Sequence, residues 1–84
     1  MDRSGFILLS VLEKSRALSR LSSMTVKEIA REEDFGIGEN TIYKKLKGFE
    51  LSGHISRGMK ESRADTYYIT EKGCKCLEEE RSRG

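Results

Sequence analysis

Apolar residues recur at helical spacing along most of the chain, and the clearest case is the segment 38–55. When successive residues are placed about 100° apart around a helix axis, Ile42, Leu46 and Phe49 share one face. Another face gathers polar and basic residues, namely Glu39, Asn40, Tyr43, Lys44 and Lys47. This division predicts an amphipathic helix over about 39–52 that buries one face and presents the other to a binding partner.

Two further helices are predicted before this segment. Ser4 can cap a first helix over about 4–18. Its inward stripe is expected to contain Leu8, Val11, Leu12 and Leu18. After a loop at 19–23, Thr25 and Glu28 have the spacing of a capping box that begins a second helix over about 26–33. Glycines then predict a tight turn between the second and third helices.

A hairpin and a last helix are predicted after residue 53. The segments 54–60 and 66–70 contain strand-forming residues and flank a charged tip, so we expect them to pair; residues 54–70 are called the wing below. Thr70 can cap a last helix over about 71–81. Gly73 on the inner face of that helix would permit a close approach to the sheet.

The first helix carries more apolar surface than one core face requires. Phe6 and Leu9 fall on the side shared with charged residues. Two interpretations are open. The chain's own last helix can cover these side chains, or they can form a dimer contact, which is the common meaning of surplus apolar surface.

Composition indicates one small folded domain over residues 1–84. Hydrophobic and charged residues each make up 36% of the 84 residues, which is too apolar for a disordered chain. The formal net charge of +2 does not by itself indicate a nucleic-acid partner. The distribution is more informative, because between residues 35 and 70 six basic residues stand against four acidic ones.

No enzymatic or metal site is expected from the sequence. His54 is the only histidine, and Cys74 and Cys76 with one distant histidine fall short of the four ligands that zinc prefers. Cys76 is expected in the core and Cys74 on the surface. We expect no cofactor, no metal and no small-molecule substrate. The chain has neither a signal-like apolar start nor a membrane-length apolar run, so we expect a cytoplasmic protein with reduced thiols.

The order helix, helix, turn, helix, hairpin, helix resembles the winged helix-turn-helix fold. The likeness is carried by the runs TVKEIA, GENTIYKKLKGFELSGHI and DTYYITEKG. Thr41 to Leu46 followed by Gly53, and Tyr68 to Gly73, are similar to patterns in PadR-like and MarR-like bacterial regulators. The chain lacks the long additional helices of those families, and its length is closer to that of a minimal, YjcQ-like winged helix. The resemblance implies an α+β, mostly helical fold with a three-helix core, a two-stranded β wing and a C-terminal helix.

The resemblance also implies a function. A regulator of this kind binds double-stranded DNA, with the third helix as the recognition helix in the major groove. The candidate DNA-binding residues are Glu39, Asn40, Thr41, Tyr43, Lys44 and Lys47 on that helix, and Lys60 and Arg63 on the wing. We expect a prokaryotic transcriptional regulator that acts as a homodimer through Phe6 and Leu9. The alternative is a winged-helix module that binds protein and not DNA, in which case the lysines form an ordinary solvated face.

Overall fold

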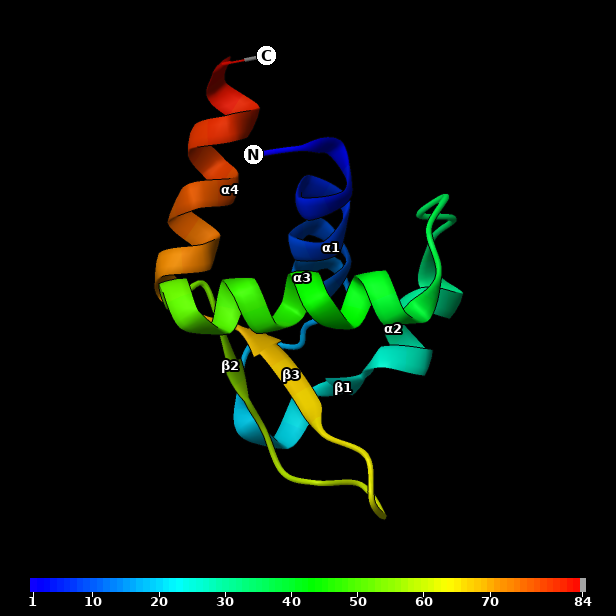
Figure 1. Ribbon diagram of the computed structural model, residues 1–84. Helices are drawn as coiled ribbons and strands as arrows, with labels where there is room; N and C mark the ends of the chain where they lie inside the picture. The colour runs from blue at the N-terminus through cyan, green and yellow to red at the C-terminus, as the bar shows by residue number, and fades with distance from the viewer. Residues whose placement is uncertain (84) are drawn as a thin grey trace.

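The computed structural model describes residues 1–83 and arranges them as helices around a small antiparallel sheet (Figure 1). The helices are α1 (Arg3–Lys14), the short 3-10 helix η1 (Arg20–Ser22), α2 (Val26–Glu32), α3 (Glu39–Ser52) and α4 (Glu71–Arg83). The strands are β1 (Met24–Thr25), β2 (Ile55–Arg57) and β3 (Thr66–Ile69). The expected α+β, mostly helical class is confirmed.

The first helix is shorter than predicted and has a different cap. Asp2, not Ser4, caps α1, since its carboxylate accepts a hydrogen bond of 2.8 Å from the Gly5 amide. The helix ends at Lys14 because Arg16 takes a positive φ of 60° and turns the chain. Ala17 is then fully buried and its carbonyl accepts from the Ile69 amide at 2.9 Å, which docks the turn on β3. The prediction that Leu18 belongs to the inward helical stripe is therefore wrong, and 46% of that residue is exposed.

The second helix begins as its sequence predicts. Thr25 Oγ1 accepts from the Glu28 amide at 3.2 Å, and Glu28 Oε1 accepts from the Thr25 amide at 2.9 Å. This reciprocal capping box satisfies two backbone donors that the first turn leaves without helical partners. The following turn contains Gly36 at a φ of +70°, a conformation in which a residue with a Cβ is strained. Phe35 is buried beside it and anchors the turn to the core.

The sheet has one strand more than the predicted hairpin. β3 lies between β1 and β2, with Tyr67 opposite Met24 on one side and Arg57 on the other. All pairings are antiparallel. The sequence predicts Thr25 only as the cap of the second helix, because a strand of two residues is too short to show a period-2 pattern. The wing is the β2–β3 hairpin, which projects from the end of the molecule opposite the N-terminus (Figure 1).

The core lies between α1, α3, α4 and the sheet. Leu8, Leu12 and Leu46 have no exposed surface, and Ile42 is 1% exposed. Leu9 is also fully buried, and α1 packs against α4, which runs beside it (Figure 1). The prediction of Leu9 as a dimer contact is wrong, because its side chain already lies within the core of its own chain. Phe6 packs partly buried against the same core.

The last helix approaches the sheet closely at Gly73, as predicted. A Cβ at this position would collide with the His54 carbonyl and lie 2.6 Å from Ile69 Cγ1. Thr70 Oγ1 accepts from the Gly73 amide at 3.2 Å, in keeping with its predicted capping role. The expected places of the two thiols are wrong. Cys74 packs against the core, where burial raises its pKa, whereas Cys76 is partly exposed outside the core cluster.

Candidate nucleic-acid interface

The third helix presents the predicted polar face. α3 spans Glu39–Ser52 and ends at Gly53, whose φ of 84° gives the left-handed cap that glycine favours. Ile42 and Leu46 are buried, and Phe49 packs against the same core. On the other side, Glu39, Asn40, Thr41 and Lys44 are exposed, and Tyr43 keeps 42% of its surface exposed. The helix thus has its buried and open faces where the sequence places them.

Lys47 is less open than the other residues of this face. Its ammonium nitrogen lies 3.3 Å from Glu50 Oε1 and 5.7 Å from the centre of the Tyr43 ring. The side chain is therefore held along the helix by an ion pair and a cation–π contact. A phosphate or base would have to compete with the Glu50 carboxylate for this lysine.

A tight turn places Arg63 at the tip of the wing. Glu61 and Ala64 exchange backbone hydrogen bonds of 3.1 and 3.0 Å, and Ser62 between them has a φ of 57°. Arg63 is exposed and makes no ion pair within residues 1–83. Lys60 lies nearer the base of the turn, with its nitrogen 3.9 Å from Asp65 Oδ1. Of the two basic residues predicted as contacts on the wing, Lys60 has a carboxylate near it within the described chain and Arg63 does not.

One basic residue near this surface was missed as a candidate site. Arg57, at the end of β2, entered the sequence analysis only in the charge count. Its Nε lies 3.0 Å from Glu50 Oε2, and its Nη1 lies 3.7 Å from Asp65 Oδ2. The Glu50 carboxylate, and then Asp65, raise the pKa of Arg57. Alternation along β2 places Arg57 on the same side as buried Ile55, and that period-2 spacing was the available sequence signal.

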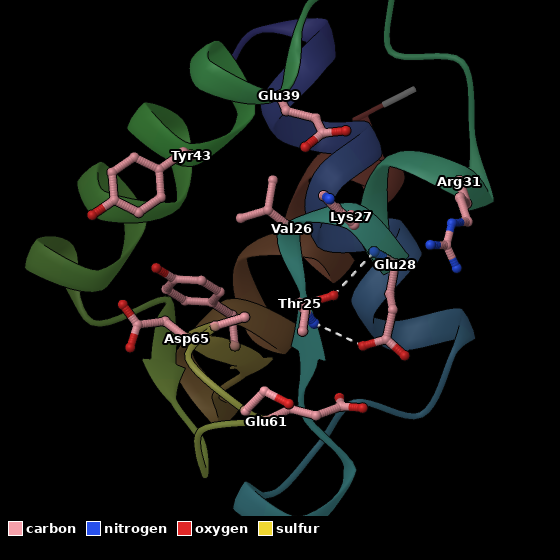
Figure 2. A pocket seen from close by; sticks show the side chains of 12 residues that line it. Thr25, Val26, Lys27, Glu28, Arg31, Glu39, Tyr43, Glu61 and Asp65 are labelled. Atoms are coloured by element: carbon pink, nitrogen blue, oxygen red, sulfur yellow. Dashed lines mark hydrogen bonds between the residues drawn. The ribbon is translucent and has the colours of Figure 1, made fainter.

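An acidic cleft of about 540 Å³ opens between α2, the N-terminal half of α3 and the wing. The four carboxylates among its lining residues belong to Glu28, Glu39, Glu61 and Asp65. The two cations that line it belong to Lys27 and Arg31. Figure 2 shows these side chains around the cleft, with the Thr25 capping box at one wall. The cleft has a formal net charge of −2, opposite in sign to the exposed face of α3.

A buried tyrosine lies beneath this region. Tyr67 lines the cleft, but it has no exposed surface, and its hydroxyl has no hydrogen-bond partner among the described residues. Burial, followed by the nearby Asp65 carboxylate, raises the pKa of Tyr67 to about 12. The phenol is therefore neutral at physiological pH. Through it, β3 contributes to the lining of the cleft.

Within residues 1–83, no cluster of three or more His, Cys, Asp or Glu side chains has a geometry that could hold a metal ion. His54 is partly buried, with its Nδ1 2.6 Å from Ser52 Oγ, and burial lowers its pKa with a further contribution from Lys72. None of the helices in the described chain has the length and apolar character needed to cross a membrane.

Comparison with known proteins identifies solved structures with similar folds. No family model matches the chain, and no curated protein matches it. Among solved structures, TubR from Bacillus megaterium aligns with a TM-score of 0.77 and 18% identity, covering 92% of this chain and 82% of that one. A PadR family transcription regulator from Clostridium difficile aligns with a TM-score of 0.76 and 22% identity, covering 98% and 86%.

A third similar structure is a complex of Staphylococcus aureus MepR with DNA. It aligns with a TM-score of 0.76 and 19% identity, covering 98% of this chain and 63% of MepR. At these identities the likeness establishes the fold and not the function. Together with the helix order and the β2–β3 hairpin, it leads to one structural conclusion. The chain has the winged-helix fold, with α2 and α3 as its helix-turn-helix and the β2–β3 hairpin as its wing.

Proposed function

We propose that this chain binds double-stranded DNA sequence-specifically as a prokaryotic transcriptional regulator. The observation that carries the proposal is the exposed polar face of α3 beside a projecting wing with a basic tip. An α-helix fits the major groove of B-DNA, where its side chains can reach the edges of the bases. The DNA complex of the similarly folded MepR supports the proposal by analogy.

The exposed residues of α3 offer chemistry suited to base edges and phosphates. The Asn40 amide can form two hydrogen bonds to adenine, and Lys44 can donate to guanine or to a phosphate. Thr41 and Tyr43 can contact a phosphate or a thymine methyl group. Glu39 lies in the first turn, where it can accept from cytosine but would repel a nearby phosphate. Lys47 can join these contacts by leaving its ion pair with Glu50 and binding a DNA phosphate or base instead.

The wing supplies the second part of the proposed interface. Arg63 at the tip and Lys60 nearer its base would lie against the flanking backbone or minor groove. Cations that neutralise phosphates release counterions, so binding should weaken steeply as the salt concentration rises.

We further propose that the protein acts as a homodimer on a two-fold-related site. Leu9 is buried and takes no part, but Phe6 remains partly exposed and lines a groove of about 260 Å³ beside α1. Ile7 and Val11 give this groove an apolar floor, which a second copy could cover. Light scattering at high protein concentration tests this proposal, and a monomeric mass there would contradict it.

The experiment on DNA binding uses fluorescence anisotropy with a mixed-sequence duplex at low salt. The double variant Lys44→Ala, Arg63→Ala removes one cation from α3 and one from the wing, and it should bind any duplex more weakly. The matched control, Lys75→Ala with Arg83→Ala, removes the same charges from exposed positions on α4. Equal affinity of the two double variants would refute the proposed interface.

The alternative function is a protein-binding winged helix. It is favoured by the pairing of Lys47 with Glu50 and by the net negative cleft beside α3. Retention on heparin or duplex DNA at low salt, followed by release at moderate salt, would favour the DNA-binding function. Passage through both columns without retention would favour the protein-binding module.

A further inference from the structure

A chain of ion pairs connects α3 to the wing. Glu50 of α3 holds Lys47 at 3.3 Å through Oε1 and Arg57 at 3.0 Å through Oε2. Asp65 of the wing holds Arg57 at 3.7 Å and Lys60 at 3.9 Å. We call these five residues the ion-pair ladder. One of its cations, Lys47, lies on α3, and the other two, Arg57 and Lys60, lie on the wing; the carboxylates of Glu50 and Asp65 join them.

Arg57 occupies the centre of this ladder. It is the last residue of β2, and it contacts Glu50 of α3 on one side and Asp65, which precedes β3, on the other. Its side chain is 43% exposed, so the guanidinium is oriented by two carboxylates and still open to solvent. The contacts use Nε and Nη1, and a guanidinium has five N–H donors, so donors remain for another anion.

The geometry of DNA determines what would lie against this position. In the proposed binding mode, α3 enters the major groove and the wing reaches the adjacent groove. Adjacent grooves of a duplex are separated by one sugar-phosphate strand, which must therefore pass between helix and wing. Resting on the proposed function, we infer that Arg57 binds a phosphate of this intervening strand, with Glu50 and Asp65 as the residues that position its guanidinium.

Electrostatics favours a phosphate at Arg57 over one at the acidic cleft between α3 and the wing. The acidic cleft at the N-terminal half of α3 has four carboxylates against two cations and would repel a phosphate. The ion-pair ladder, which shares only Asp65 with the cleft, has three cations against two carboxylates. Arginine is also suited to phosphate because its planar fork can donate two parallel hydrogen bonds. The backbone should therefore pass over Arg57 and not over the cleft.

The test measures how duplex affinity depends on salt. Each phosphate contact contributes about 0.9 to the slope of log affinity against log salt concentration. The Arg57→Gln variant keeps a polar, hydrogen-bonding side chain but removes the charge, and it should lower the magnitude of the slope by about 0.9. The matched control Arg83→Gln removes an exposed, ion-paired guanidinium from α4 and should keep the wild-type slope. If the slope depended only on the net charge of the protein, the two variants would lower it equally.

A second measurement uses the wild-type protein, so it does not depend on the folding of a variant. The side-chain Nε–H resonance of Arg57 should shift in a two-dimensional NMR spectrum when the same duplex is added, while that of Arg83 should not. An unchanged slope for Arg57→Gln, or an unmoved Arg57 resonance in a complex that forms, would overturn the Arg57 contact alone. Absence of any wild-type binding at low salt would overturn the proposed function together with it.

Discussion

Replacing Tyr67 with phenylalanine should stabilise the protein at neutral pH. Tyr67 has no exposed surface, and its hydroxyl has no hydrogen-bond partner among residues 1–83. A buried hydroxyl without a partner loses its bonds to water and gains none in the fold, at a cost of about 1–3 kcal/mol. Removing only that oxygen leaves the ring and its packing in place. We expect the free energy of unfolding to rise by about 1 kcal/mol, at the lower end of this range.

The difference between the two proteins should grow at alkaline pH. Folding raises the pKa of Tyr67 from 10.0 to about 12, so the folded state holds the phenol proton more tightly than the unfolded state. The stability linked to this proton is fully present below pH 10 and is lost as the pH rises towards 12. A rise of two pKa units corresponds to about 2.7 kcal/mol. The wild-type protein should lose this amount as the pH rises from below 10 to above 12, and Tyr67→Phe should not.

Urea unfolding followed by circular dichroism at neutral pH and across the alkaline range measures both effects. The Tyr68→Phe control removes a hydroxyl from the next residue of β3, and it should keep the wild-type alkaline loss because Tyr67 is unchanged. Comparing variants cancels the titration of the lysines, which all three proteins share. The reasoning is refuted if Tyr67→Phe is clearly less stable at neutral pH, or if its alkaline profile matches that of the wild-type protein.

Two other predictions concern packing. Leu9→Ala should lower the free energy of unfolding by about 2–5 kcal/mol in chemical denaturation without changing the solution mass, since Leu9 is a fully buried core residue. If Leu9→Ala instead lowered the solution mass and left the free energy of unfolding unchanged, Leu9 would be a dimer contact after all. Gly73→Ala should destabilise by about 1–3 kcal/mol in the same assay, because a Cβ there collides with the His54 carbonyl. Its control, Gly48→Ala on α3, has no neighbour within 4 Å and should instead stabilise by about 0.5–1 kcal/mol, so equal effects would contradict the packing argument.

Features that depend on neighbours in the sequence were predictable. The range of α3, its glycine cap and the Thr25 capping box all follow from residues within a few positions of one another. The buried face of α3 follows from a 3.6-residue period, which a helix of fourteen residues displays clearly. The open face followed from the same pattern, and so did the exposure of Asn40 and Lys44.

Features that depend on distant contacts were not predictable from local pattern. The end of α1 is set where Ala17 docks on Ile69, and β1 exists because Met24 and Thr25 meet β3. A helical wheel of α1 alone places Leu9 on an outer face. In the fold α4 packs against α1, and Leu9 is fully buried. The same helix packing places Cys74, and not Cys76, against the core.

The sequence by itself determined the winged-helix order of elements and the division of α3 into buried and open faces, because capping, glycine turns and side-chain period are local properties. Only the tertiary structure decided which cations of the proposed interface are free and which are held by carboxylates from other elements. Lys44 and Arg63 make no ion pair within the described chain, whereas Glu50 and Asp65 gather Lys47, Arg57 and Lys60. Lys47 and Glu50 are three positions apart on one helix, so that pair follows from local spacing. The pairs of Arg57 depend on distances of a few ångströms to Glu50 and Asp65, which the fold, and not the sequence, brings together.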